Sequence, residues 1–162
     1  MSSVSRIGRI ADDAITQMVA AEFFTADNLN CTSDVTPEFQ YSYSFDIPTT
    51  NTEPQVIVAA LDINPIRRGW GAENTHYRIA FGVVRRIADG TINDRTILDP
   101  LLLCVENICA YLMADKKFDT TAECISASAV MGSDLSDALR AKNLFLVAVE
   151  AEFQDNLVVS FP

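Results

Sequence analysis

Apolar residues recur at helical spacing in two segments of the chain. Within residues 5–24 they stand three or four positions apart, which predicts a helix with one apolar face. That face consists of Ile7, Ile10, Ala14, Met18 and Ala21. A second helix is predicted to begin with Asp99 as its N-cap and Pro100 in its first position. Its core-facing stripe is then Leu101, Val105, Ile108 and Leu112.

Five further segments show the alternation or the short apolar runs that are typical of strands. They are residues 38–46, 56–62, 75–86, 124–131 and 144–154. Residues 64–74 contain Pro65 and two glycines and are predicted to form a loop, and residues 133–139 a short helical turn. Glu150 and Glu152 lie on the outward face of the last strand, which predicts that this strand runs out of the core near its end.

The order of these elements, α-β-β-β-α-β-β, indicates the fold class. The connections between the second and third strands and between the fourth and fifth are short, which favours antiparallel pairing. We therefore predict one α+β domain over residues 1–162. It has a mainly antiparallel sheet of four to five strands with two helices packed on one face.

Composition and charge exclude several classes of function for this chain. The chain has 162 residues, of which 49% are hydrophobic, enough for a packed core. Its 12 Lys and Arg against 22 Asp and Glu give a net charge of −10, which disfavours gripping nucleic acid or an anionic membrane. The longest uninterrupted apolar runs, Val56–Leu61 and Leu144–Val149, are far shorter than the ~20 residues that span a bilayer. Met1–Arg9 shows no signal-peptide stretch, so we expect a soluble chain made in a cytosol.

Residues that carry chemistry are few. The chain has one histidine, His76, and four cysteines without C-x-x-C spacing, so we expect buried thiols, no metal and no cofactor. Glu150 and Glu152 share a strand face and could act as an acid and a base. Because no His, Lys or oxyanion element accompanies them in the sequence, a solvated surface explains them better. The sequence therefore predicts a protein that is not an enzyme.

Half of the cationic side chains lie between residues 61 and 100, and all of them are arginine. Arginine pairs carboxylates bidentately, and Trp and Arg are enriched in binding hot spots. The only tryptophan, Trp70, lies beside two of these arginines. Trp70 could instead fold back onto the sheet, with the arginines offsetting local acids; the sequence leaves both possibilities open. The candidate residues for a subunit or ring–ring interface are Arg67, Arg68, Trp70, Arg78, Arg85 and Arg86. His76 is also expected at a surface or interface.

Taken together, these elements resemble the tail-terminator (tail-completion) proteins of long-tailed bacteriophages. The resemblance lies in element order and apolar spacing: a first amphipathic helix, a hairpin bearing Arg and Trp, a helix that opens with Asp-Pro, and a last strand with the pattern Phe-x-Val-x-Val-x-x-x-Phe. The matching segments are Ile7–Phe24, Val56–Arg86, Asp99–Leu112 and Phe145–Phe153.

The resemblance implies a structural virion protein that forms a homohexameric ring. Such a ring caps the head-proximal end of the tail tube, ends tail polymerisation and presents a surface to head-completion or connector proteins, with a contractile sheath as a further contact. Genomic DNA passes through without specific binding, and an acidic wall would let it slide. The implied location is the tail and neck of the virion, after assembly in the host cytoplasm.

Three other interpretations remain. Another phage neck component, such as a head-completion or connector protein, would share small size, ring formation and acidity. A small-molecule-binding or enzymatic α+β domain would need a deep pocket with convergent polar groups, for which the sequence offers only His76, Glu150 and Glu152. The third is an oligomeric scaffold outside any virus.

Overall fold

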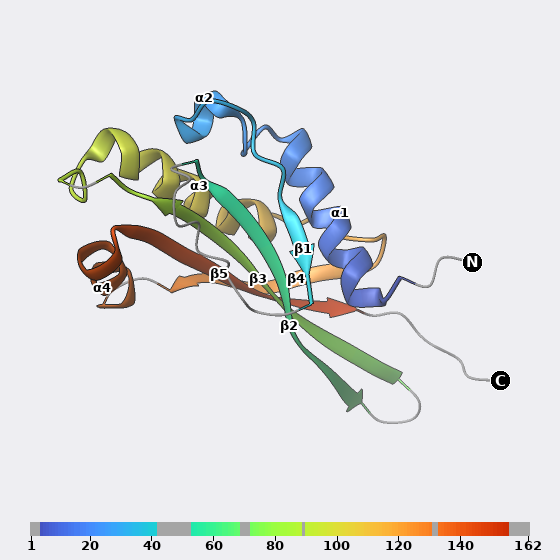
Figure 1. Ribbon diagram of the computed structural model, residues 1–162. Coiled ribbons are helices and arrows are strands. Elements are labelled where there is room, and N and C mark those ends of the chain that lie inside the picture. Colours follow the sequence, from blue (N-terminus) through green and yellow to red (C-terminus); the bar gives the residue numbers. More distant parts are fainter. Residues whose placement is uncertain (1–3, 42–52, 69–71, 89, 131–132, 156–162) are drawn as a thin grey trace.

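A five-stranded sheet with the strand order β1-β2-β3-β5-β4 organises the molecule (Figure 1). The computed structural model describes residues 4–41, 53–68, 72–88, 90–130 and 133–155. The strands are β1 (Glu38–Gln40), β2 (Gln55–Arg68), β3 (Ala72–Arg86), β4 (Ala122–Val130) and β5 (Leu144–Asp155). The helices are α1 (Arg6–Ala20), α2 (Ala26–Leu29), α3 (Arg95–Met113) and α4 (Ser133–Lys142).

The predicted fold class is confirmed. The sheet is mixed but mostly antiparallel, because only β1 pairs in parallel, with β2. The two main helices, α1 and α3, pack against the sheet and share one core with its inward-facing residues. The largest fully buried side chains of this core are Phe81, Phe118, Phe145, Phe153, Ile10, Met18, Leu29, Ile79, Leu101, Ile108, Leu112 and Leu144.

Helix α1 begins where the apolar pattern predicts, but it ends earlier. The Ser5 hydroxyl accepts a hydrogen bond from the Gly8 N–H and caps the first turn. The helix stops at Ala20 and not near residue 24, because Glu22 adopts a left-handed φ of 63°. The turn that follows buries Phe24 in the core and leads into α2, which the apolar pattern does not predict.

The predicted start of α3 is wrong by one turn. The N-cap is Asp94, whose carboxylate accepts from the Thr96 N–H at 2.9 Å, and Pro100 lies inside the helix. Since proline has no N–H, the Thr96 carbonyl loses its helical partner. The Asn30 side-chain amide at the end of α2 donates to that carbonyl at 3.0 Å. This hydrogen bond joins α2 to α3 and satisfies the carbonyl that Pro100 leaves open.

Replacing Asn30 should therefore cost stability in a way that depends on Pro100. Asn30 has a φ of 50°, so Asn30→Gly keeps the backbone and removes the amide. We expect a loss of about 1 kcal/mol in the free energy of unfolding, measured in urea. In a Pro100→Ala background, the new N–H of residue 100 can donate to the Thr96 carbonyl. Asn30→Gly should then lower the free energy of unfolding by less. Equal costs in both backgrounds would contradict this account.

The β2–β3 hairpin is longer than predicted. Residues 64–68 and 72–74, expected in a loop, are paired strand, while residues 69–71 lie outside the described part. Pro65 is compatible with a strand because β1 covers only residues 57–59 of β2 in the described structure, so β2 is an edge strand at Pro65, where proline is tolerated. Beyond Thr75, the hairpin extends past the last β5 residue that pairs with it (Figure 1). We call the described residues at this end of the hairpin, 66–68 and 72–74, the arm.

Two irregularities shift strand register and decide which residues face outward. Between Ala60 and Asp62 the pairing with β3 slips by one residue, so that Asp62 lies opposite Arg78. A second slip in β4 places Ser126 opposite Glu152. Because a slip of one residue moves side chains to the other face of a sheet, both bulges bring polar groups to the face away from α1 and α3.

The remaining strand predictions have mixed outcomes. Strand β4 is an edge strand, as predicted, and α4 is a full helix rather than a short turn. Of the expected strand 38–46, residues 38–40 form β1 and residues 42–46 lie outside the described part. The last strand does not leave the core, because Phe153 and Asp155 at its end are buried. Its acidic residues alternate with these and face outward.

Candidate functional site

The outward face of the sheet carries a row of paired charges. The Arg78 guanidinium lies 2.7 Å from the Asp62 carboxylate and 3.1 Å from that of Glu150. The hydrogen bond with Asp62, followed by the charges of Asp62 and Glu150, raises the pKa of Arg78 above its usual value. Arg78 thus links β2, β3 and β5, and its contacts here are with its own chain.

His76 and Glu152 form the next pair along this face. The His76 Nδ1 lies 2.6 Å from a Glu152 carboxylate oxygen, and the imidazole side chain is only 12% exposed. It is therefore more buried than a surface residue, and its Nε2 atom is buried without a hydrogen-bond partner in the described structure. Glu150 and Glu152 face outward as predicted, but Glu150 pairs with Arg78 and Glu152 with His76. The expectation that no histidine accompanies the two glutamates is therefore wrong, because pairing of β3 with β5 places His76 beside Glu152.

The other predicted interface arginines do not gather in one place. Arg85 donates to the backbone carbonyls of Leu29 and Asn30, at 3.2 and 3.1 Å. Arg86 follows it at the end of β3. Arg67 and Arg68 end β2 at the far end of the hairpin, and Trp70 lies outside the described residues. Of the predicted set, Arg67 and Arg68 therefore lie at one end of the β2–β3 hairpin, Arg78 near the middle of β3, and Arg85 and Arg86 at the other end of β3.

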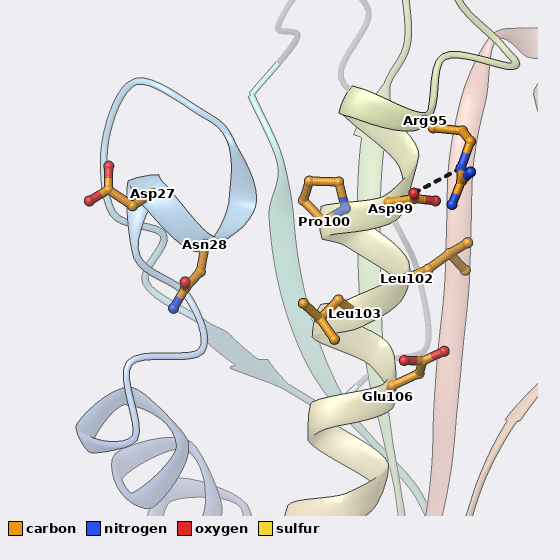
Figure 2. Close-up of a pocket in the computed structure, with 8 residues that line it drawn as sticks. All are labelled: Asp27, Asn28, Arg95, Asp99, Pro100, Leu102, Leu103 and Glu106. Atoms are coloured by element: carbon orange, nitrogen blue, oxygen red, sulfur yellow. Dashed lines mark hydrogen bonds and ion pairs between the residues drawn. The ribbon is translucent and has the colours of Figure 1, made fainter.

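A pocket of about 570 Å³ lies between α2 and the first half of α3 (Figure 2). Its lining combines charged and apolar side chains: Asp27, Asn28, Arg95, Asp99, Pro100, Leu102, Leu103 and Glu106. Arg95 pairs with Asp99 at 3.0 Å on the helix surface. We call this the acidic pocket; three carboxylates against one guanidinium make it anionic.

A second cavity, of about 480 Å³, lies between the second half of α3 and the edge strand β4. We call it the apolar groove. Apart from Glu106, its lining carries no charge: Leu102, Val105, Glu106, Cys109, Ala110, Met113 and Ala129. Leu102 and Glu106 also line the acidic pocket, so the two cavities are neighbours along α3.

Helix α3 is more apolar than its partial burial in the domain requires. By length and composition alone it could cross a membrane, yet only 28% of its apolar window is buried. One stripe of α3, the predicted one with Cys104 added, packs in the core. On its other side Leu103 and Met113 are 54% and 50% exposed. This second apolar side is visible in the sequence, because Leu102, Leu103, Ala110 and Met113 are apolar but do not belong to the core-facing stripe.

All four cysteines are free thiols, and burial raises the pKa of each. The pKa reaches about 12 for Cys104, in the core, and about 11 for Cys124. Cys109, five residues after Cys104, lines the apolar groove, so the two thiols of α3 point to different surroundings. Within the described ranges, no three His, Cys, Asp or Glu residues are placed to hold a metal ion.

The pKa order predicts an order of thiol alkylation. Since the thiolate is the nucleophile, at about pH 8 Cys31 and Cys109 should react with iodoacetamide before Cys124, and Cys104 last. Raising the pH increases the thiolate fraction, so the rates at Cys124 and Cys104 should rise about tenfold per pH unit while the pH stays below their pKa. Peptide mass spectrometry after timed quenching measures these rates. A Cys104 that reacts as fast as Cys31 would contradict the described burial.

Comparison with known proteins assigns no family to the chain. No protein-family model matches the chain, and no curated protein matches it. The function must therefore be argued from the residues and the geometry.

Proposed function

We propose that this protein is a structural component of a long-tailed phage virion, of the tail-terminator kind. It forms a closed ring, hexameric in the proteins it resembles, that caps the head-proximal end of the tail tube, ends tail polymerisation and offers a docking surface to the head.

The observation that carries this proposal is the outer side of α3. Its exposed leucine and methionine side chains and the apolar groove beside them form a surface that a soluble subunit normally covers with a partner. Next to that surface, β4 is the last strand of the sheet, so its outer N–H and C=O groups have no strand partner in the described structure. An apolar helix side and an open edge together favour assembly.

The charges support an assembly through which DNA passes. The chain has a net charge of −10, and an anionic wall repels phosphates, so a genome would slide through such a ring without sticking. The side chains that form ion pairs on the outward face of the sheet have their partners within the same chain. These include Glu150 and Glu152, the two residues considered as a catalytic acid and base. This favours a structural role over a catalytic one.

Electron micrographs of particles made without this chain test the proposal. A tail terminator predicts tails longer than those of the parent phage, because nothing stops polymerisation. Tails of normal length beside unjoined heads would show a head-completion or connector protein instead. Normal, joined particles would contradict any role in the neck. Supplying the chain from a plasmid should restore tail length, which controls for effects on neighbouring genes.

A further inference from the structure

We propose that the open edge of β4 and the apolar groove beside it bind an extended segment of a partner protein. The segment adds to the sheet as a further strand next to β4, and its alternate side chains enter the groove. The inference rests on the proposed function in one respect, that this side of the molecule meets a different protein in the particle.

Most of the edge strand β4 lacks the features that keep a strand edge unpaired. Natural edge strands carry charged residues, prolines or bulges, which prevent pairing with another chain. The bulge of β4 lies between Cys124 and Ser126, and beyond it the strand is regular to Val130. This regular part contains no charged residue and no proline, and Ser126, Ser128 and Val130 are exposed. Because a row of backbone N–H and C=O groups is best satisfied by another strand, we expect a strand to bind here.

The apolar groove lies where alternate side chains of an added strand would point. Neighbouring strands lie about 4.8 Å apart, and their side chains alternate between the two faces of the sheet. Ala127 and Ala129 are the β4 residues of this part that pack against the core. The small side chain of Ala129 leaves room for the groove of about 480 Å³, which Leu102, Cys109 and Met113 of α3 also line. An added strand would therefore direct every second side chain toward an apolar surface.

A carboxylate in the groove indicates the charge that the partner segment carries. Glu106 lines the groove and makes no ion pair in the described structure. Figure 2 shows Glu106 and Leu102 on the side of α3 away from α2. The cations on this side already have partners: Arg95 with Asp99, Lys117 with Glu123, and Lys116 with the ring of Tyr111. A Lys or Arg on the same face of the segment as its apolar residues would therefore meet Glu106.

The same carboxylate disfavours β4 of a second copy as the partner strand. Two β4 edges would pair about a two-fold axis, so each copy would bring its Glu106 to the contact without a cation to offset it. A two-fold pair also ends at two chains, which does not give the ring of the proposed function. A segment that carries apolar residues and one Lys or Arg on the same face fits both the groove and Glu106.

Binding of short synthetic peptides to the full-length chain tests the strand addition. The probe is the fluorescein-labelled, amidated peptide Thr-Val-Thr-Val-Thr-Lys-Thr, in which both valines and the lysine lie on one face of a strand. The first control, Thr-Thr-Val-Val-Thr-Lys-Thr, has the same composition but divides these residues between two faces. The second control is the probe with methyl groups on two successive backbone nitrogens, which removes an N–H from each edge of the strand. Fluorescence anisotropy measures the three affinities.

We expect the probe to bind with a Kd below about 1 mM, and both control peptides to bind at least about tenfold more weakly. Glu106→Gln should weaken binding of the probe about threefold to fivefold, because it removes the partner of the lysine. Asp12→Asn removes the same charge from an exposed position on α1 and should leave the Kd unchanged. Ala129→Trp fills the groove and should abolish binding. Amide hydrogen exchange of residues 126–130 should slow when the probe binds, while exchange in α1 stays unchanged in every variant.

A probe that does not bind below about 1 mM, or control peptides that bind as tightly as the probe, would overturn the strand addition. A peptide-free dimer in which residues 126–130 are already protected from exchange would also overturn it, because a second copy would then cover the edge.

The micrographs of particles lacking the chain test the proposed function separately. Overlong tails without peptide binding would overturn this contact and leave the tail-terminator role intact. Peptide binding as expected, together with tails of normal length, would support the contact and overturn the tail-terminator role.

Discussion

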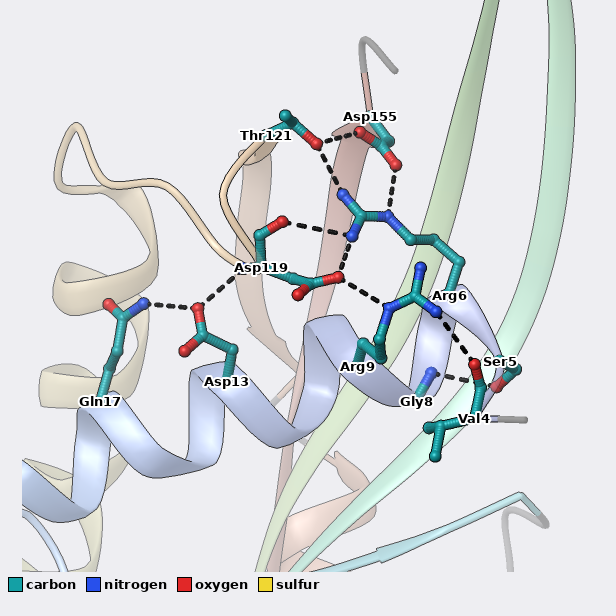
Figure 3. Close-up of polar contacts among 10 residues, drawn as sticks. All are labelled: Val4, Ser5, Arg6, Gly8, Arg9, Asp13, Gln17, Asp119, Thr121 and Asp155. Atoms are coloured by element: carbon teal, nitrogen blue, oxygen red, sulfur yellow. Dashed lines mark hydrogen bonds and ion pairs between the residues drawn. The ribbon is translucent and has the colours of Figure 1, made fainter. Parts of the chain in front are cut away.

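Replacing Arg6 with alanine should lower the free energy of unfolding by about 3–5 kcal/mol. Arg6 lies at the start of α1, with its side chain only 16% exposed, and it joins three parts of the chain (Figure 3). Its guanidinium lies 2.6 Å from the Asp155 carboxylate at the end of β5 and donates to the Thr121 hydroxyl. It also pairs with Asp119.

The cost is large because the partners stay buried when Arg6 is removed. Asp155 is only 4% exposed, and a buried carboxylate that loses its cation bears most of its desolvation penalty. The turn that carries Asp119 also depends on the cluster, since Asp119 and Thr120 both adopt positive φ values. Losing Arg6 therefore loosens the junction of α1 with the start of β4 and the end of β5.

Urea or thermal unfolding of the full-length chain measures this effect. At about 2–4 °C per kcal/mol for a domain of this size, the expected fall in Tm is about 6–20 °C. The matched control is Arg9→Ala, which removes a 45% exposed arginine from the same Asp119 carboxylate and should cost less than about 1 kcal/mol. Equal losses for the two variants would show that the buried pair with Asp155 contributes little.

Replacing Phe153 with alanine should be about as damaging, at about 3–5 kcal/mol. Phe153 is fully buried on β5, and its ring packs edge-on against Phe118, with centroids 5.3 Å apart. Phe81 of β3 lies against it as well, at 6.5 Å between centroids. Truncation would open a cavity between the sheet and the turn before β4, which cannot collapse without moving two strands.

Phe153→Leu is the control for this substitution, because it keeps most of the buried volume. We expect it to cost about 1–2 kcal/mol. Comparable urea midpoints for the alanine and leucine variants would mean that the end of β5 is less tightly packed than described. That result would favour the sequence-based expectation that the strand leaves the core.

The apolar periodicity of the sequence predicts most of the fold. The stripes of α1 and α3 and the alternation in β3 and β5 place the core residues correctly except for Ala21, which is exposed just past the end of α1. A buried face repeats its apolar residues with the period of the helix or strand, and this period is visible in the sequence. Helix and strand ends are less predictable, since they depend on tertiary contacts. Pro100 looks like the first residue of a helix until Asn30, distant in sequence, is seen to satisfy the Thr96 carbonyl.

The candidate site is less predictable from sequence than the fold. Pro65 and the glycines beside Trp70 predict a loop at 64–74, whereas cross-strand pairing with β3 extends the strand to Arg68. Charge pairing across strands is also invisible in one sequence: a bulge at residue 61 brings Asp62 opposite Arg78. The outer side of α3 could have been found from its surplus of apolar residues, but which surface they face depends on the packing of the whole domain.

The most direct test of the central claim, that copies of this chain close into a ring, is the mass of the particle that the full-length chain forms as its concentration is raised. Native mass spectrometry with analytical ultracentrifugation should show the monomer giving way to one closed species, with the mass of six chains if the resemblance holds, and nothing larger. A monomer at every concentration, or an open-ended series of masses, would contradict the account.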